Sequence, residues 1–495
     1  MDQQYILALD QGTTSSRTIA YNLSGQAIAT ANSEYQITYP QPGWVEQDPN
    51  SILESQLETL KTVLTKVDPK KVVGIGITNQ RETVICWDKL TGKALAPAIV
   101  WQCRRTAQYC EELKQSGLSE IISKKTGLVI DAYFSATKIK WLIDNNKAVR
   151  ASYDLDQAIF GTVDSWLIYN LTKSETVSNF LTDSSNASRT MLFNLATNDW
   201  DDELLTIFGI KKSALCQIKA SNSDFGRVTL FGLNAPIMGV LGDQQSSLLG
   251  HQAVQKNQIK CTFGTGAFLL KNSGNVIERS NSGLLTTVAW ALDDGCETKL
   301  TYALEGSVFI AGALIQWLRD KLGLISTSAE IESLALQAQT SNGLILVPAF
   351  VGLGAPDWDS SARGTILGLT ADTSRSNIAY AALEAISHQV ADLLDLPELS
   401  EVSMLSIDGG MSKNLLFAQI LADLTQKQIL IAAQSESTAY GAFLMAAFGL
   451  NFLDPFQSNP LSLSSVNPRL DMTTQMTARK NWQRAKERAK SWITE

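Results

Sequence analysis

The stretch LALDQGTTSSR, residues 7–17, decides the fold of this chain. An apolar run ends in an acid, Asp10, and after it come a glycine, four hydroxyl residues and an arginine. Residues 5–9 and 17–22 are both typical of strands, so the pattern predicts a β-hairpin. Gly12 lets the backbone turn tightly and approach a ligand. The hydroxyl and N–H groups of residues 13–16, together with Arg17, are donors of the kind that phosphate oxygens accept.

The acid and the turn leave two interpretations open. Asp10 could hold Mg²⁺ through water, because magnesium keeps several waters and takes only one or two carboxylates. A plain hairpin turn with a cluster of hydroxyl groups is the alternative. The sequence contains no P-loop pattern, and no G-x-G-x-x-G begins a βα unit, so the two commonest nucleotide-binding motifs are excluded.

Strand and helix patterns recur along the chain. Residues 260–268, KCTFGTGAF, repeat the order of strand, Gly-Thr turn and strand about 250 residues after the opening stretch. A helix beginning at Asp48-Pro49 precedes a strand at 72–77, and a helix over 377–394 precedes a strand at 404–410 that ends in two glycines. The pattern indicates a duplicated α/β domain with a ligand cleft between the halves. A chance repeat of common elements is the alternative.

Composition narrows the class of protein. The 495 residues carry 41 Lys plus Arg against 49 Asp plus Glu, a net charge of -8, which argues against a nucleic-acid groove. The six cysteines have no C-x-x-C spacing, so we expect reduced, buried thiols in a cytoplasmic protein. The N-terminus has no basic n-region, and the longest apolar stretch, 439–450, is too short to cross a bilayer. We therefore expect a soluble protein with no membrane partner.

Three further stretches place polar or aromatic groups just after apolar runs. TNQRETVICW, residues 78–87, sets Arg81 beside Glu82, either as a solvated surface pair or as a donor and an acceptor for a polyhydroxyl ligand. IVWQCRRTA, residues 99–107, places Trp101 either in the core or against the C–H face of a polyol. GVLGDQQSSLLG, residues 239–250, contains Asp243, either a helix N-cap or a general base that takes a proton from a hydroxyl.

With these motifs, the chain resembles the glycerol kinases of the FGGY carbohydrate kinase family, within the actin-like ATPase superfamily. DQGTTSSR, TNQRET, VWQCRRT, GDQQ, FGTG, YALEG and the IDGG strand occur in the family's order, as do YFSATKIKWLIDN (133–145) and GTILGLT with its following helix. The match runs from about Tyr5 to near Lys490. It implies an α/β fold of two actin-like (ribonuclease H-like) domains flanking a catalytic cleft. Residues 1–249 would bind glycerol and phosphate, and residues 250–495 would bind the nucleotide.

The resemblance implies ATP-dependent phosphorylation of glycerol to sn-glycerol 3-phosphate, the first step of glycerol catabolism, with ATP/ADP and Mg²⁺ as cofactors. Asp243 would be the general base, and Asp10 would orient Mg²⁺–ATP. The nucleotide phosphates would contact Thr13, Thr14, Ser15, Arg17 and Thr265, and the adenosine would contact Gly312, Gln316, Gly410 and Asn414. The glycerol hydroxyls would bind Arg81, Glu82, Tyr133, Asp243 and Gln244, and the glycerol carbons would lie against Trp101 and Phe268. Domain closure would exclude water from the reaction.

Two other functions remain open. The first is a kinase of the same family that acts on a pentulose, a hexulose or gluconate; the Arg81–Glu82 pair with Trp101 favours glycerol. The second is an actin-like or chaperone-like ATPase whose output is binding or polymerisation.

The resemblance also bears on assembly and regulation. Relatives form dimers and tetramers, so we expect a homo-oligomer. Some bacterial members bind fructose 1,6-bisphosphate through an arginine in a loop that here reads LFGLNAPIMG, residues 230–239, without one. Other members are phosphorylated on a histidine in this region, whereas the two histidines here are His251 and His388. We therefore expect neither control, unless Arg227 replaces the missing arginine.

Overall fold

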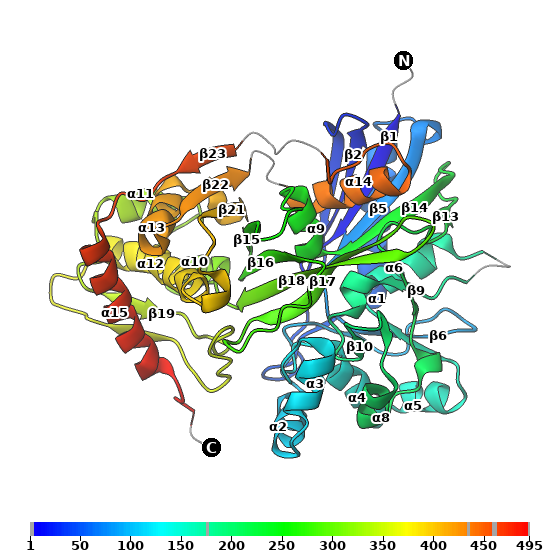
Figure 1. Cartoon of the computed structure of the whole chain (residues 1–495), viewed down its shortest axis with the longest axis horizontal. Helices are drawn as coiled ribbons and strands as arrows, with labels where there is room; N and C mark the ends of the chain where they lie inside the picture. The colour runs from blue at the N-terminus through cyan, green and yellow to red at the C-terminus, as the bar shows by residue number, and fades with distance from the viewer. Residues whose placement is uncertain (1–3, 175–177, 433–435, 458–462, 494–495) are drawn as a thin grey trace.

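A computed structural model describes residues 4–174, 178–432, 436–457 and 463–493, which form two lobes, each built on a central sheet (Figure 1). The first sheet has six strands in the order β13-β14-β5-β1-β2-β3. Strand β2 pairs antiparallel with β1 and β3, while β5 is parallel to β1 and β14 is parallel to β5. Its strands are β1 (Tyr5–Gln11), β2 (Ser15–Asn22), β3 (Ala27–Glu34), β5 (Val72–Asn79), β13 (Arg227–Val228) and β14 (Ala235–Gly242).

The second sheet has seven strands in the order β17-β18-β16-β15-β21-β22-β23. Strand β16 pairs antiparallel with β15 and β18, while β21 is parallel to β15 and β22 is parallel to β21. Its strands are β15 (Ile259–Phe263), β16 (Ala267–Gly274), β17 (Leu285–Asp293), β18 (Thr298–Val308), β21 (Met404–Gly409), β22 (Gln428–Ala432) and β23 (Leu463–Val466).

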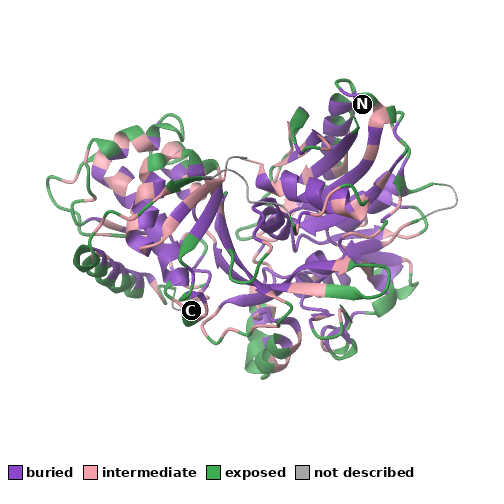
Figure 2. Cartoon of the chain, turned by 45° about the horizontal axis from the view of Figure 1, so that its top comes forward, coloured by how far each residue is buried: buried purple, intermediate pink, exposed green. Residues whose placement is uncertain are grey.

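The two sheets repeat one arrangement. The run β3-β2-β1-β5-β14 corresponds to the run β18-β16-β15-β21-β22, with three antiparallel strands followed by two parallel ones in each. The predicted duplication of an α/β unit is therefore confirmed, and the alternative of a chance repeat is wrong. Figure 2 shows that the strands of both sheets are largely buried, whereas the outer faces of the helices are exposed.

Helix α1 (Pro49–Leu64) begins where the sequence predicts, whereas α12 (Arg375–Leu394) begins two residues before the predicted start at residue 377. Helix α1 is capped by the Asp48 carboxylate, which accepts from the Asn50 amide, and it packs on β2 and β3. Helix α12 begins with a capping box between Ser374 and Asn377. Both caps satisfy amide groups that the helix itself leaves unpaired.

Helix α14 (Ser437–Gly449) follows β22 of the second sheet but packs on the first sheet and on α9 (Asp243–Gly250), as Figure 1 shows for the orange helix beside the blue strands. Small residues permit this close packing. A Cβ on Gly441 would lie 1.8 Å from the Ser246 carbonyl oxygen, so that position accepts only hydrogen. The chain thus returns to the first lobe after residue 436.

The remaining elements surround the two sheets. Residues 80–234 add helices and short strands around the first sheet: α2 (Ala107–Gln115), α3 (Ser119–Thr126), α4 (Ser135–Asn145), α5 (Lys147–Asp154), α6 (Val163–Thr172), α7 (Ser184–Ala187), α8 (Asp202–Phe208), β6 (Ile85–Asp88), β7 (Ala98–Ile99), β8 (Ala158–Gly161), β9 (Leu181–Asp183), β10 (Phe193–Asn194), β11 (Asp199–Trp200) and β12 (Gln217–Lys219), with β4 (Glu46–Gln47) preceding them. The second lobe adds α10 (Gly312–Asp320), α11 (Glu330–Leu336), α13 (Leu415–Thr425), α15 (Met472–Ala489), β19 (Ile345–Val347) and β20 (Thr365–Leu367).

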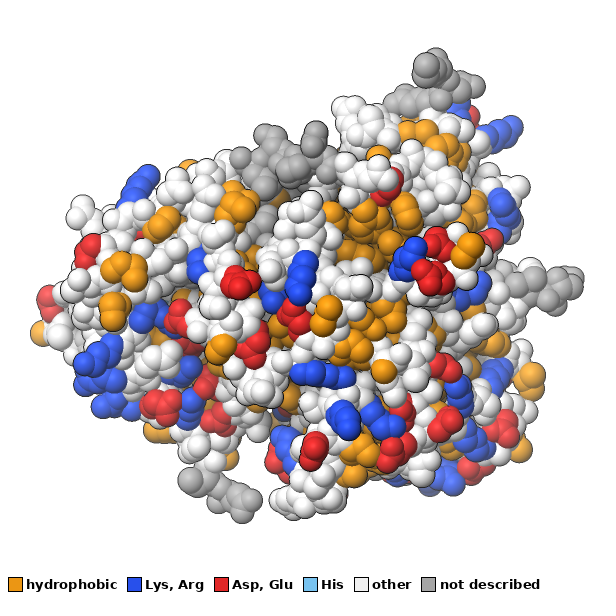
Figure 3. Space-filling model, in the orientation of Figure 1, with side chains coloured by type: hydrophobic (Ala, Val, Ile, Leu, Met, Phe, Trp, Pro, Cys, Tyr) orange, Lys and Arg blue, Asp and Glu red, His pale blue; other side chains and the backbone are white. Residues whose placement is uncertain are grey.

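The surface and the thiols are unexceptional. Figure 3 shows basic and acidic side chains interspersed over one face of the molecule. All six cysteines are free, and five of them are buried as the sequence predicts, whereas Cys296 is exposed. Across the ranges that the structure describes, none of the helices combines the length and the apolarity needed to cross a membrane.

Candidate active site

The turn after β1 is held from behind by hydrogen bonds to its carbonyl groups. The Gly12 carbonyl oxygen accepts from the Tyr35 hydroxyl at 2.5 Å and from Gln80 Nε2 at 3.4 Å. The Thr13 carbonyl oxygen accepts from Gln47 Nε2 at 2.6 Å. These bonds fix the backbone of the turn, and the Gly12 amide donates to the Ser15 carbonyl oxygen at 3.0 Å. Exposed N–H and hydroxyl groups of a turn fixed in this way are donors that phosphate oxygens accept. Thr14 is exposed beside it.

Ser16 and Arg17 already have partners within the protein. The Ser16 hydroxyl is buried, donates to Gln11 Oε1 at 2.9 Å and lies 2.5 Å from Ser55 Oγ, so its interpretation as a phosphate donor is wrong. Arg17 forms an ion pair with Glu436, just before α14, so a phosphate group would compete with this carboxylate.

Six separate stretches of the sequence meet in one pocket of about 160 Å³, which we call the Asp243 pocket. All seven residues expected to bind glycerol line it, together with one residue of the first turn and several of the second. Its lining is Thr13, Arg81, Glu82, Trp101, Tyr133, Asp243, Gln244, Thr262, Gly264, Thr265, Gly266 and Phe268.

Arg81 and Glu82 are both almost completely buried, so they are not a solvated surface pair. Arg81 Nε lies 3.1 Å from Asp243 Oδ1 and Arg81 Nη1 lies 2.5 Å from Glu305 Oε2. The guanidinium is thus fixed by two carboxylates on different elements, β18 for Glu305 and α9 for Asp243.

Arg189 completes this charged cluster. Its Nε donates to Glu82 Oε1 at 2.6 Å and its Nη2 donates to Glu305 Oε1 at 2.7 Å. Burial opposes ionisation of Glu305, but Arg189 and Arg81 outweigh it and lower the Glu305 pKa to about 2. Sequence reasoning missed both residues. Glu305 lies in the YALEG motif, which offered a signal, whereas nothing in the sequence around Arg189 indicated a role.

The backbone at Glu82 is in an unusual conformation. Its φ is 58°, in the left-handed region that non-glycine residues rarely occupy. The Glu82 carbonyl oxygen accepts from Ser135 Oγ at 3.1 Å and from Lys138 Nζ at 3.0 Å, and these bonds hold the strained turn. Strain of this kind is concentrated at functional sites.

Aromatic rings form one wall of the Asp243 pocket. Trp101 is only partly buried, and its Nε1 donates to Thr13 Oγ1 at 3.0 Å. The Trp101 ring lies 5.7 Å from the ring of Tyr133 and 6.0 Å from that of Phe268. The tryptophan is therefore a pocket residue that also contacts the first turn, rather than a core residue.

Asp243 is the first residue of α9, and the N-cap position belongs to Gly242. Its Oδ1 accepts from the Gln244 amide at 2.7 Å and its side chain is 29% exposed, toward the pocket it lines. Burial raises the Asp243 pKa, and Arg81 and Lys260 oppose that shift. Burial also raises the pKa of Asp10, to about 6, against the opposing charge of Arg17 and with a further increase from Asp243.

A second pocket of about 510 Å³, the Asn414 pocket, opens in the second lobe. The residues predicted to hold adenosine all line it, together with the second Gly-Thr turn. Among its lining residues are Gly264, Thr265, Gly312, Gln316, Glu332, Gly410 and Asn414. It shares Gly264 and Thr265 with the Asp243 pocket, so the two pockets meet at that turn.

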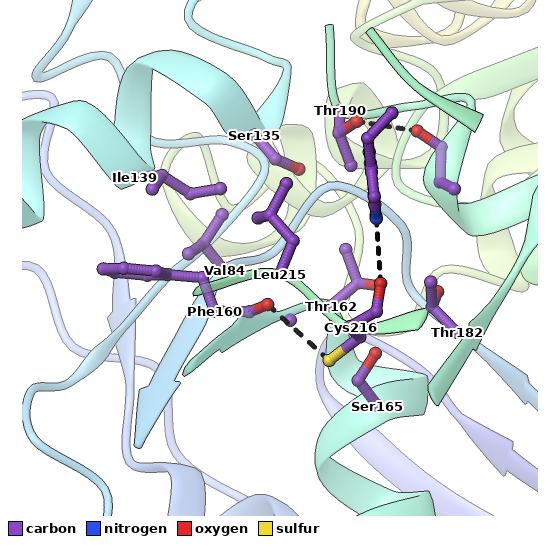
Figure 4. A pocket seen from close by; sticks show the side chains of 13 residues that line it. Val84, Ser135, Ile139, Phe160, Thr162, Ser165, Thr182, Thr190, Leu215 and Cys216 are labelled. Carbon is purple, nitrogen blue, oxygen red and sulfur yellow. Dashed lines mark hydrogen bonds between the residues drawn. The ribbon is translucent and has the colours of Figure 1, made fainter. Parts of the chain in front are cut away.

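A smaller cavity of about 20 Å³ lies elsewhere in the first lobe (Figure 4). Among its lining residues are Phe160, Thr162, Ser165, Thr182 and Cys216. The Cys216 thiol donates to the Phe160 carbonyl oxygen at 3.7 Å. No residue predicted for the site lines this cavity.

The part of the chain that the structure describes holds no cluster of three or more His, Cys, Asp or Glu side chains suited to a metal ion. Asp10 and Asp243, however, lie close enough that the charge of Asp243 raises the Asp10 pKa. Two carboxylates that repel each other suit a divalent cation. Magnesium takes only one or two protein carboxylates, so it could enter this site already bound to a ligand.

Comparisons with known proteins agree with this geometry. The chain matches both domains of the FGGY family of carbohydrate kinases. The N-terminal domain of the family matches residues 5–250, and the C-terminal domain matches residues 259–450. Glycerol kinase 2 of Thermotoga maritima is 45% identical over 500 residues, which cover 99% of each chain. A crystal structure of Plasmodium falciparum glycerol kinase with ADP has a TM-score of 0.86 and 36% identity, covering 100% of this chain and 99% of that one. A xylulose kinase from Lactobacillus acidophilus, with a TM-score of 0.84 and 23% identity, shares the fold.

Proposed function

Because the chain belongs to the FGGY family of carbohydrate kinases, we propose that it transfers the γ-phosphoryl group of ATP to glycerol and forms sn-glycerol 3-phosphate. One observation carries the proposal: a pocket lined by a buried Arg-Glu pair, an aromatic wall and a carboxylate adjoins a larger pocket at a Gly-Thr turn. That arrangement brings an alcohol and a nucleotide phosphate to one place. Full-length similarity to glycerol kinases selects glycerol among the alcohols of this family.

The Asp243 pocket matches a small polyol in chemistry. Arg81 donates hydrogen bonds and Glu82 accepts them, so the pair binds hydroxyl groups in both senses. Trp101 and Phe268 cover the carbon atoms. The cluster with Glu305 and Arg189 keeps these polar groups in fixed positions, so little reorganisation is needed when the substrate binds.

Asp243 acts as the general base. Its carboxylate takes the proton of the reacting hydroxyl as the oxygen attacks the γ-phosphorus. Arg81 and Lys260 favour the ionised form of this carboxyl group, and ionised Asp243 is the form that accepts a proton.

The protein's remaining task is to hold the phosphates and stabilise their charge. Donors of Thr13, Thr14, Ser15 and Arg17 hold the phosphates from the first lobe, and Thr265 holds them from the second. The adenosine lies against Gly312, Gln316, Gly410 and Asn414 in the Asn414 pocket. Asp10 would hold Mg²⁺–ATP through water, and the metal would supply positive charge that neutralises the transferring phosphoryl group.

The proposal extends to organisation and location. Residues 1–249, with α14 packed on their sheet, form the glycerol- and phosphate-binding domain, and the rest of residues 250–495 forms the nucleotide-binding domain. Closure of the lobes excludes water. Free buried thiols and the use of ATP fit work in the cytoplasm. The chain forms a homo-oligomer, dimer or tetramer, which light scattering on the purified protein tests.

A coupled assay of ADP release tests the reaction. With Mg²⁺–ATP, addition of glycerol is expected to start ADP release, and xylulose or gluconate at equal concentration is expected to give much less. Preferred turnover of xylulose or gluconate would reassign the substrate. ATP hydrolysis that no polyol changes would indicate a binding ATPase instead.

A further inference from the structure

A buried lysine connects the two lobes behind the Asp243 pocket. Lys260 lies in β15 of the second sheet and is completely buried. Its Nζ donates to Gln244 Oε1 at 2.6 Å and to Thr262 Oγ1 at 2.8 Å. Gln244 belongs to α9, which packs against α14 and the first lobe and also contacts β15. The function proposed above uses Lys260 only as a positive charge that favours ionised Asp243, although its ammonium group also contacts a residue that lines the pocket.

The chemistry of the two groups fixes the orientation of the glutamine. An ammonium group has three donors and no acceptor, and an amide side chain has one oxygen acceptor and one N–H₂ donor. Only Gln244 Oε1 can therefore face Lys260. The N–H₂ group at the other corner of the amide is then free to face the pocket, which Gln244 lines.

We propose that Lys260 is a positioning residue that sets the hydrogen-bond polarity of the substrate pocket, by holding Gln244 so that its amide donates to a hydroxyl oxygen of the alcohol. This inference rests on the proposed function. The neighbouring Asp243 carboxylate only accepts hydrogen bonds when ionised, so the pair offers one donor and one acceptor side by side. A hydroxyl group that gives its proton to Asp243 and accepts from Gln244 matches both.

The surroundings of Lys260 keep it charged. Burial lowers its pKa to about 8, and the carboxylates of Asp408 and Asp243 oppose that shift, so the amine is still mostly protonated at pH 7. Asp408 is itself held in place: Ser437 Oγ donates to Asp408 Oδ2 at 2.5 Å, and His251 Nε2 lies 3.3 Å from the same oxygen. The ammonium group thus keeps its donor character toward Gln244 and Thr262.

A double-mutant cycle tests the inference. The glycerol KM and kcat are measured for the wild type, Lys260→Met, Gln244→Ala and the double variant. Each single change is expected to raise the glycerol KM roughly tenfold, the worth of one hydrogen bond to a charged or well-placed group, and to lower kcat less. Because the lysine acts through the glutamine, the double variant is expected to have a KM no higher than that of the worse single variant.

Two further variants keep the test decisive. Lys271→Met removes another buried lysine of the second sheet, paired with Glu278 at 2.8 Å, and is expected to leave the glycerol KM unchanged. If Lys260→Met does not fold, Gln244→Glu retains an oxygen for Lys260 but loses the N–H₂ donor, and it is expected to raise KM at least as much as Gln244→Ala.

The outcomes separate the two proposals. If the KM increases of the two single variants multiply in the double variant, Lys260 does not act through Gln244. A Gln244→Glu protein with wild-type KM would contradict the proposal in the same way. Either result overturns the role of Lys260 and leaves the proposed kinase activity intact. A wild-type protein that releases no ADP with glycerol would overturn both.

Discussion

Replacing Asp243 with asparagine removes the proposed base and little else. Asparagine has nearly the same size and keeps an oxygen that can accept from the Gln244 amide, now 2.7 Å from Asp243 Oδ1. The same oxygen lies 3.1 Å from Arg81 Nε, so a neutral acceptor remains beside the guanidinium. Arg81 also keeps Glu305, at 2.5 Å. The fold is therefore expected to survive the substitution.

The rate is expected to fall steeply. General base catalysis is worth roughly 10²–10⁴-fold, or about 3–5 kcal/mol of transition-state stabilisation. The glycerol KM should also rise, because the carboxylate accepts more strongly than the amide oxygen. The loss in kcat should nevertheless exceed the rise in KM, since proton transfer occurs only in the transition state.

Steady-state ADP release with saturating ATP measures both constants. Asp357→Asn is a matched control, because Asp357 is a partly buried carboxylate that pairs with Lys486 at 3.0 Å, on α15. The control is expected to change stability without changing kcat. If Asp243→Asn retains kcat within a few-fold of wild type while remaining folded, Asp243 is not the base.

Three other changes have distinct expected outcomes. Trp101→Ala should raise the glycerol KM more than it lowers kcat. Its loss of stability should be smaller than the roughly 3–5 kcal/mol expected for a tryptophan buried in the core. A steep fall in Tm with normal KM would place the ring in the core. Burial raises the Glu384 pKa to about 7 from 4.5, so this carboxyl group makes stability fall as pH rises from about 4.5 to about 7. Glu384→Gln should therefore increase Tm relative to wild type at pH 8 and change it little at pH 4, and equal differences at both pH values would contradict the shift. Millimolar fructose 1,6-bisphosphate should leave activity unchanged, because the 230–239 loop has no arginine and Arg227, which precedes it, already donates to the Asn234 carbonyl oxygen at 2.9 Å. Inhibition that disappears in Arg227→Ala would refute this.

Local patterns in the sequence were sufficient to predict the repeated unit. Asp48-Pro49 predicts the start of α1, because aspartate is favoured at the N-cap and proline at the first helical position. The strands β1, β5 and β21 are short apolar runs that end in glycine or polar residues, and this pattern identifies buried parallel strands.

The expected site residues also proved to lie together, although their individual roles stay predictions. Seven residues from five separate stretches line one pocket, and the second Gly-Thr turn borders both pockets. Resemblance to a family supplied this grouping, because no periodicity relates Arg81 to Phe268.

Contacts between side chains that are far apart in the sequence could not be predicted from one sequence. Glu305 and Arg189 are 116 residues apart, and their ion pair at 2.7 Å depends on how β18 meets the turn after α7. The direction of the Ser16 hydroxyl depends on Ser55 in α1, which only the packing of that helix brings near. The role inferred for Lys260 likewise depends on the contact of α9 with β15.

The most direct test of the account is a crystal structure of the protein with glycerol and a non-hydrolysable ATP analogue. The account predicts a glycerol hydroxyl within hydrogen-bond distance of the Asp243 carboxylate and the Gln244 amide nitrogen, with the γ-phosphate between the residue 12–15 turn and Thr265. Glycerol bound outside the Asp243 pocket, or a triphosphate that does not reach Thr265, would contradict it.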